Sequence, residues 1–326
     1  MHRNHIILIA ISAAILTAAG GIYIIQPRLS QGAHIIVIST TTSLYDTGIL
    51  DMLEDEFETL HPIDLRFVSV GTGLAISYGE RGDADMILVH APPLERPFLE
   101  EGYGVNRKIL AYNFFSIIGP PEDPAGIHDK PLTEALRALV EKGQEGGALW
   151  ISRGDESGTH AKEKEIWRLA GFDASALREE EWYKEAGAGM GRTLQVAWEY
   201  EAYTLTDKGT YLRYKNEGLT NLEVMVTGGE DLINVYSAIA VNPSTAPDVN
   251  FDDSMTFIQY LASEEGQAIL GSFGVETYGT NLFNPAVELL ETRTDPFIAE
   301  CIEAAAFFEG TECPVEYRRG EYDLYG

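Results

Sequence analysis

Short apolar strands alternate with amphipathic helices along most of this chain. Apolar runs predict strands at 34–38, 64–69, 84–90 and 148–152. Apolar side chains also recur at helical spacing, as in Leu50, Leu53, Phe57 and Leu60. Further helices are predicted at 94–101, 132–142, 161–170, 194–200, 253–262 and 264–272. This alternation predicts an α/β fold with a mostly parallel sheet covered by helices on both faces.

Two longer apolar segments, 107–119 and 235–243, differ from the short strands. We interpret 109–118 and 234–241, which overlap these segments, as crossover strands that join two lobes. Residues 34–113 and 240–290 are then assigned to lobe I, residues 114–239 to lobe II, and residues 291–326 to a C-terminal extension. A chain of 326 residues with 45% hydrophobic content can bury a core in each lobe.

The N-terminal segment has the composition of an export signal. Residues 6–25 carry no charge and follow Arg3. About twenty apolar residues match the hydrocarbon core of a bilayer, so the segment can remain as a signal anchor, while the small residues at 18–20 also permit cleavage. In either case the rest of the chain is exported, and residues 1–33 are assigned to an anchor and linker. The predicted location is extracytoplasmic.

Charge and cysteine content narrow the class of protein. The formal net charge of −28 disfavours nucleic acid as a partner, because a phosphate backbone requires basic surfaces. The chain contains two cysteines, Cys301 and Cys313, and two thiols cannot make a paired CxxC metal site. In an oxidising exterior, two cysteines that close a short loop are expected to form a disulfide. The sequence therefore predicts a Cys301–Cys313 bond and no metal site.

A loop at 151–162 combines features that bind anions. Arg153 precedes Ser157, Gly158 and Thr159 at the predicted start of a helix. The free N–H groups and the dipole of a helix N-terminus favour negative charge, and small hydroxyl side chains add further donors. The arginine supplies a full charge and a planar pair of donors suited to an oxyanion. An ordinary helix cap and a surface ion pair are the alternative interpretation of this loop alone.

Other strand-to-helix loops repeat this donor-rich pattern. Thr41, Thr42 and Ser43 follow the first strand, and Thr72 and Gly73 follow the second. Thr193 ends a glycine-rich stretch before another predicted helix. A flexible turn is the alternative interpretation of this stretch. None of these loops has the spacing of a nucleotide-binding motif. Ligands bind beyond the carboxyl ends of strands in such folds, so the loops are expected to converge on one site.

An enzyme is the alternative class of protein. Ser157, His160 and His90 suggest a nucleophile with a base, and Asp155 could complete a triad. The sequence around Ser157 lacks the G-x-S-x-G pattern of hydrolases, however. Isolated histidines are also weak indicators of a metal site. We therefore expect a binding protein without catalytic residues or cofactor, and keep an exported Ser/His hydrolase as the alternative.

Taken together, these motifs resemble those of the tungstate-binding proteins of ABC importers, the TupA family. The resemblance rests on 40–43 (TTTS), 70–73 (VGTG), 82–90, 152–160 (SRGDESGTH), 189–194, 202–207 and 241–243. It implies a type II periplasmic-binding-protein fold, in which two α/β lobes close on one oxyanion and deliver it to a membrane permease and its ATPase. It also implies that the threonine-rich and arginine loops make the ligand contacts. We expect the protein to be a monomer. These contacts map onto Thr41, Thr42, Ser43, Arg153, Ser157 and Thr159. Thr72 and Thr193 match the family's contacts less closely, and Gly73 and Gly158 lie in the same loops.

The protonation of the anion narrows the choice of ligand. Tungstate and molybdate are fully deprotonated at neutral pH and need donors only, whereas hydrogen phosphate benefits from a carboxylate acceptor. We expect Asp85 to point into backbone turns and Asp155 to brace Arg153, because an unpaired carboxylate beside a buried dianion is costly. If Asp85 faced the ligand, phosphate would become credible. The preference for tungstate over molybdate rests on the resemblance.

Overall fold

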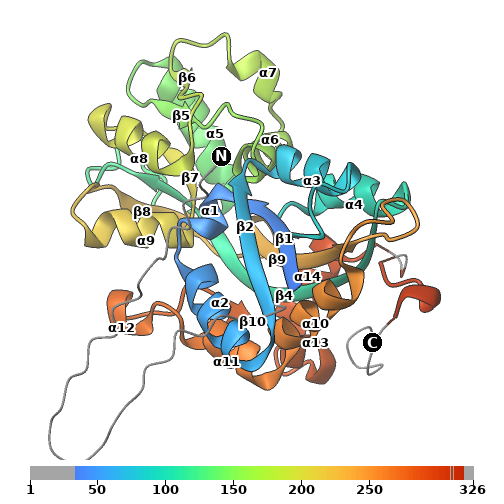
Figure 1. Cartoon of the computed structure of the whole chain (residues 1–326). Coiled ribbons are helices and arrows are strands. Elements are labelled where there is room, and N and C mark those ends of the chain that lie inside the picture. Colours follow the sequence, from blue (N-terminus) through green and yellow to red (C-terminus); the bar gives the residue numbers. More distant parts are fainter. Residues whose placement is uncertain (1–33, 309, 311, 319–326) are drawn as a thin grey trace, which may run out of the picture. The chain divides into compact units, whose positions relative to one another are not determined.

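Two long strands join two α/β lobes in the computed structural model, which describes residues 34–308, 310 and 312–318 (Figure 1). The strands are β4 (Gly104–Gly119) and β9 (Ile233–Val241), and they contain both predicted crossover segments. The predicted anchor at 6–25 lies outside the described residues. Within the described part of the chain, no helix is long and apolar enough to cross a membrane.

Lobe I comprises the elements before β4 and after β9. Its strands are β1 (His34–Thr41), β2 (Ile63–Val70), β3 (Met86–Val89) and β10 (Asn284–Pro285). Its helices are α1 (Thr42–Tyr45), α2 (Ile49–Leu60), α3 (Thr72–Glu80), α4 (Pro92–Glu100), α10 (Phe251–Ala262), α11 (Glu264–Ser272), α12 (Val275–Tyr278), α13 (Val287–Thr292), α14 (Pro296–Ala306) and the 3₁₀ helix η2 (Val315–Tyr317).

Lobe II comprises the elements between the two crossover strands. Its strands are β5 (Trp150–Ser152), β6 (Tyr183–Glu185), β7 (Thr204–Asp207) and β8 (Glu223–Thr227). Its helices are α5 (Leu132–Gln144), α6 (Gly158–Leu169), α7 (Ala174–Leu177), α8 (Met190–Glu199), α9 (Lys208–Asn216) and the 3₁₀ helix η1 (Glu230–Leu232).

The main sheet is mixed, with the order β10-β4-β9-β3-β1-β2. Strand β1 runs parallel to β2 and β3, but β9 runs antiparallel to β3 and β4. The prediction of a mostly parallel sheet is therefore wrong. It failed because the two crossover strands are not part of the β-α-β alternation, and each adds antiparallel pairs to the sheet.

Strand β4 changes partners as it passes from one lobe to the other. It pairs with β9 as far as Phe114, opposite Ile233, and with β7 from Phe115, opposite Asp207. Strand β8 also pairs with the second half of β4. This exchange makes β4 a continuous element of both lobes, as a crossover strand requires. The lobe boundaries at 113/114 and 239/240 stay predictions.

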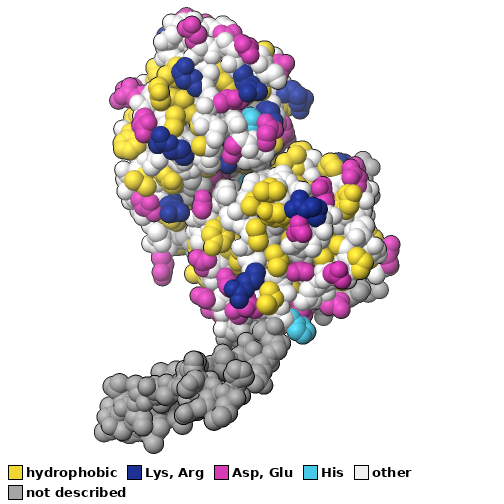
Figure 2. Space-filling view, turned by 45° about the horizontal axis from the view of Figure 1, so that its top comes forward, with side chains coloured by type: hydrophobic (Ala, Val, Ile, Leu, Met, Phe, Trp, Pro, Cys, Tyr) yellow, Lys and Arg dark blue, Asp and Glu magenta, His cyan; other side chains and the backbone are white. Residues whose placement is uncertain are grey.

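Each lobe has its own buried core. In lobe I, Phe57 of α2 packs against Phe257 of α10, with ring centroids 4.8 Å apart. In lobe II, Trp150 and Trp167 meet edge to face with centroids 5.0 Å apart. Leu60 is 62% exposed at the last residue of α2, so the predicted apolar face ends one turn earlier. Figure 2 shows acidic side chains scattered over both lobes rather than gathered in one patch.

The C-terminal residues fold back onto lobe I. Helix α14 packs on β9, and Cys301 lies among apolar side chains that include Ile109 and Ile302. Cys313 instead directs its sulfur at the backbone carbonyl of Arg107, 3.4 Å away. Both cysteines are free thiols, so the predicted Cys301–Cys313 disulfide is wrong. Short sequence separation predicted it, but the packing gives each sulfur different neighbours.

Candidate functional site

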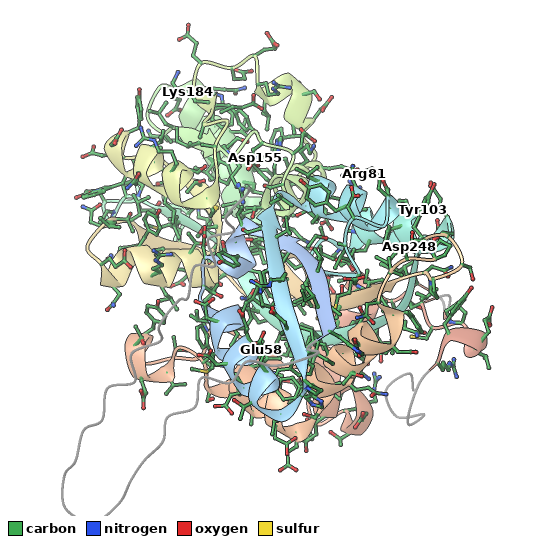
Figure 3. All side chains as sticks on the ribbon, viewed as in Figure 1. Glu58, Arg81, Tyr103, Asp155, Lys184 and Asp248 are labelled. Atoms are coloured by element: carbon green, nitrogen blue, oxygen red, sulfur yellow. The ribbon has the colours of Figure 1, made fainter. Side chains whose placement is uncertain are left out.

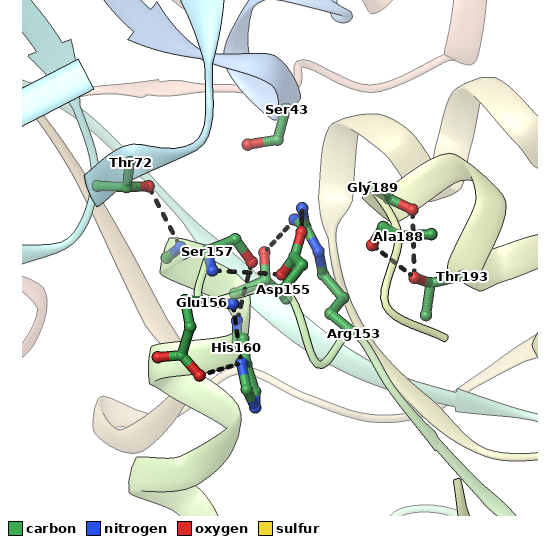
Figure 4. A network of polar contacts seen from close by, with 12 residues as sticks. Ser43, Thr72, Arg153, Asp155, Glu156, Ser157, His160, Ala188, Gly189 and Thr193 are labelled. Carbon is green, nitrogen blue, oxygen red and sulfur yellow. Dashed lines mark hydrogen bonds and ion pairs between the residues drawn. The ribbon is translucent and has the colours of Figure 1, made fainter. Parts of the chain in front are cut away.

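The donor-rich loops follow the carboxyl ends of strands, as predicted. The threonine loop lies between β1 and α1, the Thr72 loop between β2 and α3, and the arginine loop between β5 and α6. The first two belong to lobe I and the third to lobe II. Figure 4 shows Ser43, Thr72 and Arg153 around one region between the lobes, and Figure 3 places Asp155 there, beyond the end of β2. The fold therefore brings these three loops together.

The Arg153 side chain is buried and only partly paired. Its Nη1 donates to Thr159 Oγ1 at 3.2 Å, and its Nη2 donates to Asp155 Oδ2 at 2.5 Å. Its Nε has no hydrogen-bond partner among the described residues, although the residue is 3% exposed. A buried guanidinium N–H without an acceptor is costly. The site thus holds a charged donor in need of an acceptor.

Asp155 braces the arginine loop, as the sequence predicted. Besides its ion pair with Arg153, its Oδ1 accepts from the backbone N–H of Ser157 at 3.2 Å. Ser157 in turn caps α6, because its Oγ accepts from the N–H of His160 at 3.2 Å. Both oxygens of Asp155 are therefore engaged by donors. The loop is held in one shape before any ligand arrives.

The threonine loop is organised around a histidine. Thr41 caps α1 by accepting from the N–H of Leu44 at 3.2 Å, and Thr42 is the half-buried first residue of that helix. Ser43 Oγ lies 3.0 Å from His90 Nε2, and Thr41 Oγ1 lies 3.1 Å from the same nitrogen. His90 follows β3, so two strand ends of lobe I meet here.

Contacts between the lobes hold the loops close together. Thr72 Oγ1, at the start of α3, accepts from the N–H of Gly158 at 3.2 Å. On another part of the interface, Arg213 of α9 donates to the carbonyl of Asp46 at 2.9 Å. These two hydrogen bonds join lobe I to lobe II directly. Gly73, the neighbour of Thr72, is exposed and makes none of these contacts.

Thr193 is buried in lobe II, near the start of α8. Its hydroxyl donates to the carbonyls of Ala188 and Gly189, both at 3.2 Å. That proton is therefore already used within the helix terminus (Figure 4). The structure thus groups Thr41, Ser43, Thr72, Arg153, Ser157, Gly158 and Thr159 through direct contacts or shared loops, while the Thr193 hydroxyl serves its own turn.

Comparison with known proteins identifies the family. The model of the PBP superfamily domain matches residues 28–265. The tungstate-binding protein TupA of Peptoclostridium acidaminophilum is 38% identical over 256 residues, which are 78% of this chain and 87% of that protein. The chain belongs to the TupA family.

Solved structures support this assignment. The tungstate-binding protein TupA from Desulfovibrio alaskensis G20 superposes with a TM-score of 0.69 at 40% identity, covering 78% of this chain and 99% of that chain. A structure described as the tungstate ABC transporter from Geobacter sulfurreducens gives a TM-score of 0.65 at 44% identity, covering 73% of this chain and 98% of that one. The predicted type II periplasmic-binding-protein fold is confirmed.

Asp85 does not face the candidate site of this TupA-family protein. Its Oδ2 accepts from the N–H of Val37 and its Oδ1 from the N–H of Asn250, both at 2.6 Å. Asp207, at the end of β7, likewise accepts from the N–H and the hydroxyl of Thr210 at 2.8 Å. The expectation for Asp85 is confirmed. Each of these carboxylates is already engaged by local donors.

The first feature that the sequence did not predict is the pair of buried residues that contact His90. Asn234 of β9 accepts from His90 Nδ1 at 2.9 Å, and the imidazole stacks on Tyr236 with centroids 4.8 Å apart. Burial lowers the pKa of His90, although the hydrogen bond to Asn234 opposes this. Both partners lie in an apolar crossover strand, where polar residues among apolar ones were the available signal.

Glu163 of α6 is the second missed feature. This buried carboxyl accepts from Tyr183 OH at 2.6 Å, from Trp150 Nε1 at 2.8 Å and from Ser152 Oγ at 3.0 Å. It therefore ties α6 to β5, the strand that leads into Arg153. Burial raises the pKa of Glu163, and the hydrogen bonds oppose that rise. A glutamate on an otherwise apolar helical face was the signal in the sequence.

The contacts do not support Ser157 and His160 as a nucleophile and base. Ser157 Oγ accepts from the backbone of His160, while His160 Nδ1 accepts from the backbone of Glu156 at 3.1 Å. Burial also lowers the pKa of His160. No group of three or more His, Cys, Asp or Glu residues suited to a metal ion occurs in the described part of the chain.

Proposed function

We propose that this chain is an extracytoplasmic solute-binding protein that captures tungstate and delivers it to an ABC importer. The observation that carries the proposal is the buried Arg153, whose Nε lacks an acceptor among the described residues. Figure 4 shows Ser43 of the threonine loop and the N-terminus of α6 around the same region as Arg153. An oxyanion would supply the missing acceptor and the charge that this group of donors favours.

The state of the carboxylates supports a fully deprotonated anion. Asp85, Asp155 and Asp207 each accept hydrogen bonds from their own surroundings. None is therefore an unpaired acceptor set aside for the proton that hydrogen phosphate carries at neutral pH. A site made of donors suits tungstate, molybdate or sulfate, and penalises a ligand that must bury an unpaired O–H. The names of the relatives favour tungstate over molybdate.

Partners and location follow from the same function. We propose that an ABC permease with its ATPase receives the ligand, and that the protein acts as a monomer without a cofactor. We further propose that the apolar segment at 6–25 exports the chain and anchors it in the membrane. Western blots of membrane and soluble fractions, with and without a 6–25 deletion, test the anchor.

Calorimetric titration of the purified full-length protein tests the function. Tungstate is expected to bind tightly, molybdate to compete with it, and phosphate to give no heat of binding. Arg153→Ala should weaken tungstate binding by about 2–5 kcal/mol, because it truncates one partner of a buried charged contact. Arg168→Ala, an exposed change on α6, the helix that follows the arginine loop, is the matched control. Phosphate binding in preference to tungstate would refute the assignment.

A hydrolase is the second candidate, and one arrangement favours it. Ser43, His90 and Asn234 are hydrogen-bonded in series, in the order of a nucleophile, a base and an orienting group. If the protein were an esterase, it would turn over p-nitrophenyl acetate, and Ser43→Ala would abolish that turnover. We expect no turnover above the rate of a His128→Ala control, whose exposed imidazole lies elsewhere in lobe II.

A further inference from the structure

His90 connects the threonine loop to both crossover strands. Its ring lies buried between the hydroxyls of Thr41 and Ser43 on one side and the amide of Asn234 on the other. Asn234 of β9 stands opposite Asn113 of β4 in the strand register. The polar series therefore runs from the candidate ligand site into the pair of strands that joins the lobes.

The direction of every proton in this series follows from one backbone carbonyl. Asn113 Nδ2 donates to the carbonyl of Leu282 at 3.1 Å, which can only accept. The Oδ1 of Asn113 must then face Asn234, and it accepts from Asn234 Nδ2 at 2.9 Å. With its amide nitrogen so placed, Asn234 presents Oδ1 to His90. His90 Nδ1 must therefore carry a proton, at 2.9 Å from that oxygen.

The remaining amide protons agree with this assignment. Asn234 Nδ2 also donates to Tyr236 OH at 2.9 Å, and Asn113 Nδ2 donates to the same oxygen at 3.3 Å. Each amide nitrogen thus has an acceptor for both protons. Turning Asn113 around would place its Oδ1 against the carbonyl of Leu282, and turning Asn234 around would place its Oδ1 against Asn113 Oδ1. Buried polar groups avoid such pairs of acceptors.

The other ring nitrogen is then an acceptor facing two hydroxyls. In a neutral imidazole with Nδ1 protonated, Nε2 offers one lone pair. Thr41 Oγ1 lies 3.1 Å and Ser43 Oγ 3.0 Å from it, and the two oxygens lie 3.3 Å apart. One hydroxyl proton occupies the lone pair. The second hydroxyl proton can bridge the two oxygens over this long contact or donate to another acceptor.

We propose that His90 is a positioning residue of the oxyanion site. Asn234 and Asn113 fix its tautomer, so that Nε2 accepts one hydroxyl proton from Thr41 or Ser43. The other hydroxyl proton is then left to donate to the ligand. The proposal rests on the proposed function for the ligand, but the tautomer itself does not. It deepens that function by explaining how a loop of hydroxyls presents a proton, rather than a lone pair, to a dianion.

Charged groups around the ring are consistent with a neutral imidazole. The carboxylates of Asp207 and Glu95 favour protonation of His90, whereas the Arg153 guanidinium and burial oppose it, with burial the largest influence. Glu95 is itself in a buried ion pair with Arg107 at 2.7 Å, and Asp207 caps α9. Burial outweighs both carboxylates and lowers the pKa of His90 below its ordinary value, so the ring is neutral at physiological pH.

Nitrogen NMR of histidine-labelled full-length protein without ligand tests the tautomer. One ring spin system, assigned by its loss in His90→Phe, is expected to show a protonated Nδ1 and an unprotonated Nε2 at neutral pH. A ring protonated at Nε2, or at both nitrogens, would overturn the proposal. This readout depends on neither tungstate nor any change in stability. It therefore separates failure of this proposal from failure of the proposed function.

Binding assays test the consequence for the ligand. Asn234→Leu removes the acceptor that fixes the tautomer and should weaken tungstate binding about 3- to 10-fold, the typical loss for one hydrogen bond. Asn221→Leu, at an exposed loop of lobe II, is the matched control and should leave affinity unchanged. Unchanged affinity in a folded Asn234→Leu variant would contradict the proposal. If that variant does not fold, the tautomer measurement on the wild type decides.

Discussion

The hydroxyl of Thr72 in lobe I accepts a hydrogen bond from the backbone N–H of Gly158 in lobe II, at 3.2 Å. Gly158 is the first residue of α6, so its N–H is one of the groups that a helix leaves unpaired. The side chain of one lobe thereby caps a helix of the other. Closure is stabilised by a contact that exists only when the lobes meet.

Removing this contact should favour the open form. Thr72→Val keeps the shape of the side chain but cannot accept from Gly158. We expect tungstate affinity to fall about 3- to 10-fold, with a larger radius of gyration in X-ray scattering at subsaturating ligand. Thr59→Val, on the exposed surface of α2, is the control. An unchanged radius and affinity in Thr72→Val would show that the contact contributes nothing to closure.

The geometry of Arg153, and not charge alone, should determine binding. Arg153→Lys keeps the positive charge but loses the planar fork that reaches Thr159 and Asp155 together. Loss of one charge-assisted hydrogen bond predicts tungstate binding weakened about 10- to 100-fold in calorimetry. Arg168→Lys, on the exposed side of α6, should bind as the wild type does. Full affinity in Arg153→Lys would reduce the role of Arg153 to a point charge.

Glu163 should make stability depend on pH. Its pKa in the folded protein is raised, mainly by burial, above the ordinary value of 4.5. The folded state thus holds the proton more tightly than the unfolded chain, so this contribution is complete below the unfolded pKa and declines as the pH rises through the folded pKa. Glu163→Gln cannot titrate, and serves as the reference.

Urea denaturation at several pH values between about 4 and 8 measures this effect. The unfolding free energy of the wild type minus that of Glu163→Gln should fall as the pH rises. Glu165→Gln, an ion-paired surface glutamate on α6, gives the background of an ordinary carboxylate. A wild-type difference that rises with pH would mean that the hydrogen bonds to Glu163 outweigh its burial.

Both thiols should be detectable without reductant. Unfolding the protein in guanidinium chloride with iodoacetamide is expected to add two carbamidomethyl groups by mass spectrometry, because Cys301 and Cys313 are free. In the folded protein Cys313 should react slowly near neutral pH, since burial raises its pKa to about 12. A protein that gains no adduct until it is reduced would contain the disulfide that the sequence first suggested.

The local motifs were predictable because they have local causes. Helix caps such as Ser157 and donor-rich turns such as Thr41–Ser43 depend on neighbours in sequence, and the structure places them at strand ends as expected. The pairing of β4 with β7, β8 and β9 depends on residues more than a hundred positions apart in β8 and β9. Periodicity carries no information on such partners, so the mixed sheet was missed.

The residues that hold the site in place were harder to predict than the residues that donate hydrogen bonds in it. Arginine, serine and threonine before a helix indicate an anion directly. Asn113, Asn234 and Glu163 act through His90 and through the end of β5. Their polar character among apolar neighbours marks them in the sequence, but it does not reveal which residues they contact. The free state of Cys301 likewise depends on the packing of α14 against β9. Tertiary structure alone determines each of these.

The face-to-face asparagines of β4 and β9 have a consequence for unloading. These strands join the two lobes, and Asn113 and Asn234 lie opposite each other where they pair. Any shear between them would disturb the amide that orients the imidazole, and through it the hydroxyl protons offered to the cargo. A transporter that separates the lobes would thus weaken the hydrogen bonds between this protein and the anion, without itself contacting the anion.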